Sequence, residues 1–119
     1  MASVYSRAQA IADGVLIDVT PLAKSEGFRL HTVMTCGVVA EVKAQVEKVF
    51  SDVMAFVEKE AVYWAALKDV LQALHEAIRQ QKESTDTIHF KHAGLDLWSL
   101  VGPGDTAAPV LTIMLEGED

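Results

Sequence analysis

Cysteine is almost absent from this chain of 119 residues, because Cys36 is the single one and no internal disulfide can form. Half of the residues are hydrophobic, so a chain of this size can bury a sizeable core without a bridge or a metal ion. The sequence contains no repeat and no low-complexity tract. We therefore expect a single domain over residues 1–119.

Long hydrophobic runs are also missing. The longest, Ala61–Leu67, has seven residues, whereas a membrane-spanning helix needs about 20. The first residues, MASVYSRAQAIADG, contain no cationic segment followed by an apolar block, so no signal peptide is expected. These absences predict a cytoplasmic protein of bacterial type that does not enter a membrane.

Basic residues are in short supply, with 10 Lys and Arg against 17 Asp and Glu, and the net charge is −7. Nucleic-acid-binding proteins gain much of their affinity by neutralising phosphates, so direct nucleic-acid binding is not expected here. The acidic residues are spread along the chain, which is typical of a charge that keeps a protein soluble. An acidic protein that mimics DNA or binds a basic partner is the alternative.

The strongest positive signal is a helical pattern over Ala61–Gln81. Apolar side chains recur there at three- and four-residue spacing: Trp64, Leu67, Leu71, Leu74 and Ile78. The segment contains no Gly or Pro and is rich in good helix formers. We expect this amphipathic helix to cover the strands that follow it.

Earlier helical patterns are shorter or less regular. Ser6–Asp13 begins with a capping-box pattern and stops at Gly14, and Thr20-Pro21 places an N-cap before a first-turn proline. An extended connection over Phe28–His31 then leads into a helical region that starts at about Thr32. The helical pattern continues over Ala40–Glu60, and whether this segment is one helix or two, with a break at Ser51-Asp52, stays open.

Four segments read as strands, because apolar and polar residues alternate in them or β-formers dominate: Val15–Val19, Thr87–His92, Leu95–Val101 and Pro109–Leu115. Tight turns are expected at Ala93-Gly94 and over Gly102–Asp105. The pattern predicts an α+β fold. Its antiparallel sheet has three to four strands, a C-terminal meander with Val15–Val19 as the optional fourth, and amphipathic helices pack on one face.

Residues that carry chemistry in other proteins are present here without the spacing that the chemistry needs. The histidines are His31, His75, His89 and His92. His89 and His92 lie on opposite faces of one predicted strand, so they do not form a chelating pair. His75 has no second histidine four residues on, so the helical zinc-protease motif is absent. Cys36 reads as a small buried residue, and the GPGD turn lacks the Lys and Ser or Thr of a P-loop. No metal site, cofactor or catalytic residue is expected.

Two blocks of the sequence resemble a known family when they are taken together. Tyr5–Val19 (YSRAQAIADGVLIDV), with the AKSEGF that follows, resembles the opening of the DUF6573-like group, which are small bacterial proteins of unknown function. Gly102–Asp119 (GPGDTAAPVLTIMLEGED) resembles the ending of the same group, whereas residues 31–86 depart from its pattern. The resemblance covers about a third of the chain. It implies an origin on plasmids or other mobile elements and a cytosolic location, and it brings no activity or catalytic residue.

These observations favour a protein that acts by binding. Our first interpretation is a non-enzymatic accessory protein of a mobile element, which binds another macromolecule, an unidentified protein partner, as a homodimer. The alternative is a small-molecule binder or enzyme with a site between the N-terminal block and the C-terminal hairpin. The residues that would line this site are Tyr5, Arg7, Asp13, Asp18 and Asp105. A further alternative is an acidic decoy of a host DNA-binding defence protein.

Overall fold

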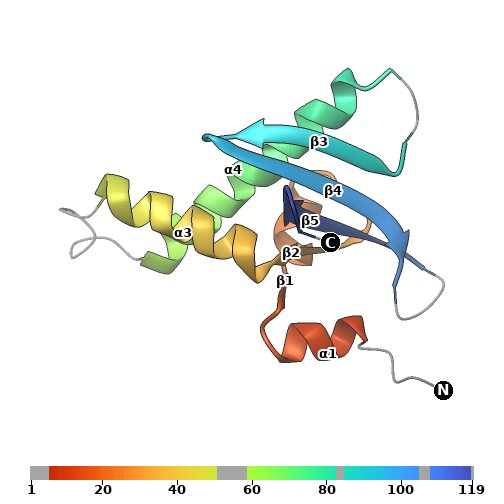
Figure 1. The fold of residues 1–119 in the computed structure, drawn as a ribbon, viewed down its shortest axis with the longest axis horizontal. Coiled ribbons are helices and arrows are strands. Elements are labelled where there is room, and N and C mark those ends of the chain that lie inside the picture. Colours follow the sequence, from red (N-terminus) through yellow and green to blue (C-terminus); the bar gives the residue numbers. More distant parts are fainter. Residues whose placement is uncertain (1–5, 51–58, 83–84, 105–107, 119) are drawn as a thin grey trace.

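The computed structural model describes residues 6–50, 59–82, 85–104 and 108–118, and the structural statements below concern these residues. Their helices and strands follow one another in the order α1 (Arg7–Ala12), β1 (Leu16–Asp18), α2 (Thr20–Ser25), β2 (His31–Thr35), α3 (Cys36–Phe50), α4 (Lys59–Gln80), β3 (Thr87–His92), β4 (Leu95–Pro103) and β5 (Pro109–Leu115). The fold is therefore α+β, as the sequence predicts (Figure 1).

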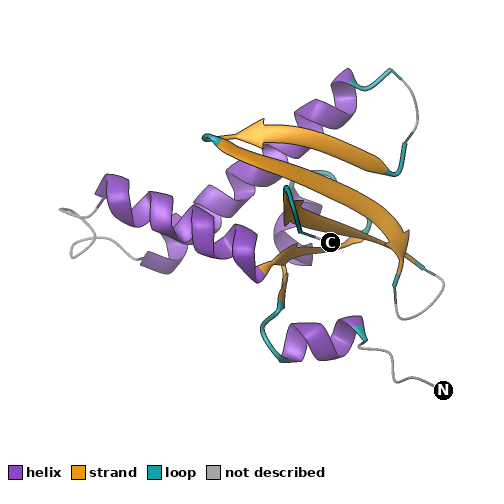
Figure 2. Ribbon diagram, in the orientation of Figure 1, coloured by secondary structure: helices purple, strands orange, loops and turns teal. Residues whose placement is uncertain are grey.

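The described strands form one sheet in the order β1-β2-β5-β4-β3 (Figure 2). The meander β3-β4-β5 is antiparallel, as expected, and β1 pairs antiparallel with β2. However, β2 runs parallel to β5. The prediction of a purely antiparallel sheet of three to four strands is thus wrong, because the sheet has five strands and is mixed.

The strand that the sequence does not predict is β2. We expect an extended connection over Phe28–His31 and a helix from Thr32, but the segment His31–Thr35 is a strand and the helix begins at Cys36. Four of the five residues of β2 are buried, since the strand lies between β1 and β5 and is covered on both faces. A strand that is buried on both faces loses its alternation, so its apolar residues run on into those of α3 and mimic a helical pattern.

The core lies between one face of the sheet and the pair of helices α3 and α4. From the helices it contains Val38, Val39, Val42, Leu67, Val70, Leu71 and Leu74, and from the sheet Met34, Ile88, Phe90, Leu97, Leu111 and Ile113. The helix predicted over Ala61–Gln81 is confirmed as α4. Leu67, Leu71 and Leu74 of its apolar stripe are buried in the core, whereas Trp64 and Ile78 at the two ends of the stripe are exposed. Burying each of these large side chains stabilises the fold by roughly 1.5–3 kcal/mol before the entropy cost of folding.

Helix α1 lies apart from the other helices, across the sheet from α3 and α4 (Figure 1). Successive residues of a strand point to opposite faces, and Leu111 and Ile113 of β5 point into the core, so Thr112 between them faces away from it. Arg7 of α1 donates a hydrogen bond to the hydroxyl of Thr112. The prediction that the helices pack on one face of the sheet therefore needs correction, since α1 packs on the other.

Helices α3 and α4 are two helices rather than one continuous helix. The hydroxyl of Tyr63 on α4 donates a hydrogen bond of 2.7 Å to Glu47 on α3, and Lys43 lies 5.3 Å from the centre of the Tyr63 ring. Sixteen residues of uninterrupted helix would separate the backbones of residues 47 and 63 by about 24 Å. Residues 47 and 63 therefore belong to separate helices, and the position of the possible break, residues 51–52, lies outside the described residues.

The local signals at the ends of the short helices are partly confirmed. The Ser6 hydroxyl accepts a hydrogen bond of 3.0 Å from the backbone of Gln9, and Gly14 follows α1 with a φ of +79°. At α2 the expected cap is wrong, because Thr20 is already helical. Its backbone N–H donates to the carboxylate of Asp18 at 2.9 Å, and its hydroxyl instead bonds the backbone of Thr32 on β2.

The turn expected over Gly102–Asp105 is also displaced. Gly102 and Pro103 remain in β4, where they pair with Val110 and Pro109 of β5. The strand then ends at Gly104, whose backbone N–H donates to the Ala108 carbonyl at 3.1 Å. A Cβ atom at this position would lie 2.9 Å from a methyl group of Val110, so only glycine lets the two strands approach here.

Candidate functional site

The two family-like blocks, at opposite ends of the sequence, lie side by side in the structure. Arg7, in the first block, donates to the Thr112 hydroxyl and to the Leu111 carbonyl at 3.5 Å, both in the second block. The second block is held at its far end as well, since the Glu118 carboxylate accepts hydrogen bonds of 2.8 Å from Thr35 and from the backbone of Leu115. The structure thus joins segments that are more than 100 residues apart.

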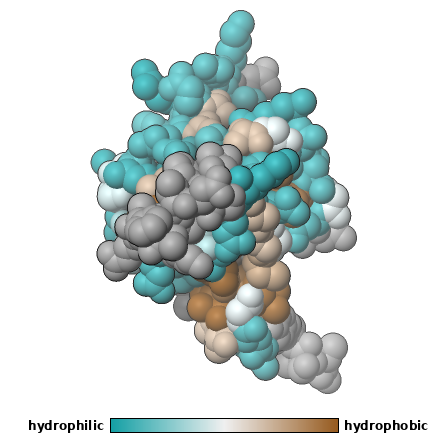
Figure 3. Space-filling view, turned by 90° about the vertical axis from the view of Figure 1, so that its left-hand side faces the viewer, coloured by the Kyte–Doolittle hydropathy of each residue, from teal (hydrophilic) through white to brown (hydrophobic). Residues whose placement is uncertain are grey.

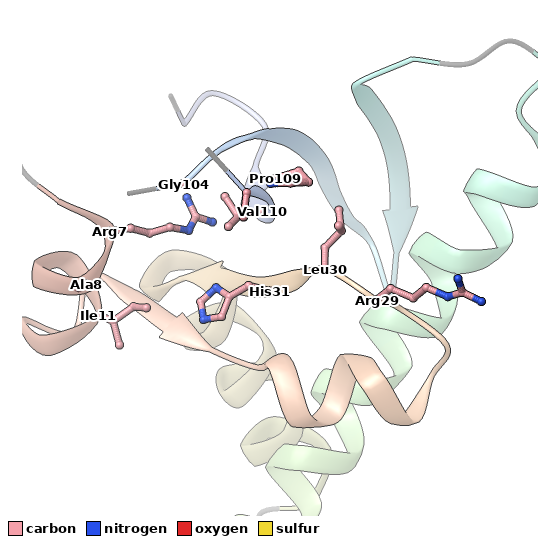
Figure 4. Close-up of a pocket in the computed structure, with 10 residues that line it drawn as sticks. Arg7, Ala8, Ile11, Arg29, Leu30, His31, Gly104, Pro109 and Val110 are labelled. Atoms are coloured by element: carbon pink, nitrogen blue, oxygen red, sulfur yellow. The ribbon is translucent and has the colours of Figure 1, made fainter. Parts of the chain in front are cut away.

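An open hollow of about 520 Å³ lies between α1, the start of β2 and the β4–β5 connection, and we call it the α1 hollow (Figure 4). It is lined by Arg7, Ala8, Ile11, Arg29, Leu30, His31, Gly104, Ala108, Pro109 and Val110. Its volume lies within the range of about 300–1,000 Å³ that ligand sites occupy. Both family-like blocks contribute to its wall.

The lining of the α1 hollow is basic, although the chain as a whole is acidic. None of the ten described residues that line it is acidic, and two of them are arginines. The guanidinium of Arg7 lies beside Gly104 and Val110, whereas Arg29 extends away from them and leaves its aliphatic stem at the hollow (Figure 4). Of the two arginines, Arg7 thus places its guanidinium at the hollow, and a guanidinium suits an anionic group.

His31 connects this hollow to the carboxylate of Asp18 on β1. The Nε2 atom of His31 lies 3.4 Å from Oδ2 of Asp18, and both side chains are 41% exposed. Burial works to raise the pKa of Asp18, but the hydrogen bonds that Thr20 donates and the neighbouring His31 outweigh it, so the pKa lies below its ordinary value. Asp18 is therefore ionised at neutral pH and is an acceptor, not an acid, next to His31.

The structure brings together part of the predicted set of site residues. Arg7 lines the α1 hollow. Asp18 does not line it but contacts His31, which does. Asp13 is the C-cap of α1 and does not line the hollow. Tyr5 and Asp105 lie outside the described residues. The predicted site thus stays a prediction for those two.

Arg29 and His31 line the hollow but are absent from the predicted set. The sequence carries a weak signal for them, because two basic residues flank a single leucine at positions 29–31. Their role is hidden because residues 28–31 read as a connection, whereas His31 actually begins the strand that pairs with Asp18's neighbours on β1 and with Val110 on β5.

The remaining candidate residues do not assemble into a reactive centre in the part of the chain that the structure describes. No group of three or more His, Cys, Asp or Glu side chains there is placed to hold a metal ion. Cys36 is exposed at the first residue of α3, so the expectation that it is buried is wrong. His89 stacks on the ring of Trp98 at 6.0 Å between centroids and bonds Glu116.

Comparison of the chain with models of protein families, with curated proteins and with solved structures finds no match. Among the described helices, none has both the length and the apolar character that crossing a membrane requires.

Proposed function

We propose that this chain is a non-enzymatic accessory protein of a mobile element, located in the cytoplasm, which binds another macromolecule through the α1 hollow and acts as a homodimer. One observation carries the proposal. The two blocks that resemble the ends of DUF6573-like proteins meet at this hollow, with Arg7 on one side and Val110 on the other. A family whose members share these two blocks would share this surface.

The chemistry of the hollow supports a partner that presents acidic groups beside apolar ones. Arg7 and His31 offer hydrogen-bond donors, and Ile11, Leu30 and Val110 supply an apolar floor. An acidic nucleic-acid backbone is disfavoured by the net charge of −7, whereas a short acidic segment of a protein suits the charge of Arg7 at the hollow.

Apolar side chains are also exposed outside the hollow. Hydrophobic side chains gather where α1 and β1 lie (Figure 3). Val15, at the end of the α1–β1 connection, is 45% exposed. Apolar surface that continues beyond a hollow is typical of protein–protein contact. This favours a macromolecular partner.

A small-molecule site is the second candidate, and the α1 hollow itself favours it through its volume of about 520 Å³. In that interpretation His31, held by Asp18, is the proton-transferring group beside a substrate anion bound by Arg7. A thermal-shift screen with nucleotides, nicotinamide cofactors, divalent metals and short duplex DNA separates the two candidates. A ligand at 100 times its dissociation constant adds about 2.7 kcal/mol of stability, which is a clear shift.

Affinity capture with a blocked hollow tests the first candidate. Ala8→Glu places a carboxylate on the wall of the hollow, and glutamate is well tolerated in the first turn of a helix. Gln72→Glu makes the same change of charge at an exposed position of α4. We expect a bacterial host protein that the unmodified chain and Gln72→Glu both capture and that Ala8→Glu loses. An unchanged set of captured proteins with Ala8→Glu would overturn the proposal.

A further inference from the structure

A second hollow lies on the other side of Asp18, between α2 and α4, and we call it the Trp64 hollow. It has a volume of about 420 Å³ and is lined by Asp18, Pro21, Leu22, Ser25 and Trp64. Trp64 is 43% exposed, which is unusual for so large an aromatic side chain. Exposed tryptophan beside an apolar wall is typical of surfaces that bind a partner.

Apart from the indole N–H of Trp64, which is a donor, the polar side-chain groups that line the Trp64 hollow can act as acceptors. The Asp18 carboxylate accepts from the backbone N–H of Thr20 at 2.9 Å and is also engaged by the Thr20 and His31 side chains, but its two oxygens can accept about four hydrogen bonds, so it keeps some acceptor capacity. The Ser25 hydroxyl donates to the Leu22 carbonyl at 2.6 Å, which directs its hydrogen away from the hollow. A ligand that enters here therefore meets lone pairs, a carboxylate and the indole ring.

This combination selects a cation on an aliphatic stem. The face of a tryptophan ring attracts ammonium and guanidinium groups, and a nearby carboxylate adds a charge-assisted hydrogen bond. Leu22 and Pro21 provide the apolar surface along which the methylene groups of lysine and arginine pack. The net charge of −7 further concentrates cations near the protein.

We propose that the Trp64 hollow binds a lysine or arginine side chain from a basic, extended segment of a partner protein. The inference goes beyond the proposed function, since it concerns a different hollow and the opposite charge. The two hollows share one wall, because Asp18 lines one and its partner His31 lines the other.

The neighbouring strand explains why the cation comes on an extended segment. Strand β1 is at the edge of the described sheet. Just beyond its two ends, Val15 and Val19 make the backbone hydrogen bonds to the β2 side. The Cys36 N–H donates to the Val15 carbonyl at 2.9 Å, and the Val19 N–H donates to the Thr32 carbonyl at 3.0 Å. The backbone groups of Leu16 and Asp18 therefore point away from β2. A segment paired with this edge would run past the hollow and place a side chain in it.

A titration with hexa-arginine tests the proposal, and hexa-citrulline, which is neutral but nearly isosteric, is the matched control. The chain has two tryptophans, so in the Trp98→Phe variant the fluorescence emission comes from Trp64 and its change reports binding. If that variant fails to fold, calorimetry on the unmodified chain repeats the measurement. We expect saturable binding of hexa-arginine and at least about tenfold weaker binding of hexa-citrulline.

Variants at the hollow locate the binding. Asp18→Asn keeps an acceptor for Thr20 and should weaken hexa-arginine binding by about tenfold or more. Asp96→Asn is the control, because it removes the same charge on β4, next to the edge strand β3 at the other end of the sheet. This variant should change the affinity for hexa-arginine little. Trp64→Leu, which keeps an apolar wall, should also lose binding. Equal binding of the two peptides, equal effects of Asp18→Asn and Asp96→Asn, or no saturable binding would each overturn the proposal.

Discussion

The guanidinium of Arg7 donates a hydrogen bond to the hydroxyl of Thr112, although 105 residues of sequence separate them. The same group lies 3.5 Å from the carbonyl of Leu111, so one side chain fastens α1 to β5 on the face of the sheet away from the core. This contact makes the two ends of the chain into one surface and forms a wall of the α1 hollow. It serves folding and shapes the candidate site at once.

Replacement of Arg7 should therefore cost stability. Arg7→Ala removes charge-assisted hydrogen bonds at a half-buried position, and we expect a loss of about 1–2 kcal/mol in the free energy of unfolding. Arg79→Ala is the matched control, since its side chain is 68% exposed and pairs with Glu76 at 3.7 Å within α4. That variant should lose about 0.5 kcal/mol or less. Urea unfolding of both measures the difference, and equal losses would show that the Arg7 contact contributes nothing special.

The two glycines near the end of β4 should respond differently to alanine. A Cβ at Gly104 would lie 2.9 Å from Val110, whereas one at Gly102 would have no heavy atom within 4 Å. We expect Gly104→Ala to destabilise the fold by about 1–3 kcal/mol through overpacking. Gly102→Ala should be neutral or slightly stabilising. Thermal unfolding of the pair decides the matter, and a harmless Gly104→Ala would contradict the close approach of the two strands.

Asp18 should make stability depend on pH. Its pKa is lowered in the folded state, so its contribution is present above the unfolded pKa and is lost as the pH falls through the folded one. The thermal midpoint of the unmodified chain should therefore fall relative to that of Asp18→Asn below about pH 4. Melting curves from pH 2 to pH 7, roughly spanning this titration, give the comparison. A constant offset between the two midpoints would mean that Asp18 gains nothing from Thr20 and His31.

The proposed homodimer predicts a solution mass of twice 12.9 kDa at micromolar concentration. Four large apolar side chains in the described residues are exposed: Val15 before β1, Trp64 and Ile78 on α4, and Leu100 on β4. Sedimentation equilibrium of the unmodified chain tests the dimer directly. A mass of 12.9 kDa across the concentration range would remove the homodimer from the proposal and leave the binding of another partner to be tested separately.

The sequence predicts those parts of the fold that local contacts determine. Helix α1 is capped within four residues by Ser6, and the strands β3 and β4 alternate and meet at a two-residue turn, where Ala93 and Gly94 have φ values of 51° and 82°. These features depend on neighbouring residues, so a local pattern reveals them. The amphipathic stripe of α4 is likewise a property of one segment.

The features that the sequence does not reveal depend on distant partners. Strand β2 is a strand because β5, more than 70 residues later, and β1 pair with it, whereas its own residues continue into the pattern of α3. The same holds for the candidate site. Arg7 is recognisable as a candidate, but the contribution of His31 follows from a sheet register that local patterns cannot give.

Photo-crosslinking in the bacterial host tests the central claim most directly. A photoreactive amino acid replaces Ala8, on the wall of the α1 hollow, and the control places it at Gln72, on the exposed face of α4. We expect a discrete covalent adduct with one protein partner from position 8 and no adduct with that partner from position 72. The same adducts from both positions, or none from position 8, would contradict the claim that the joined ends of the chain form its binding surface.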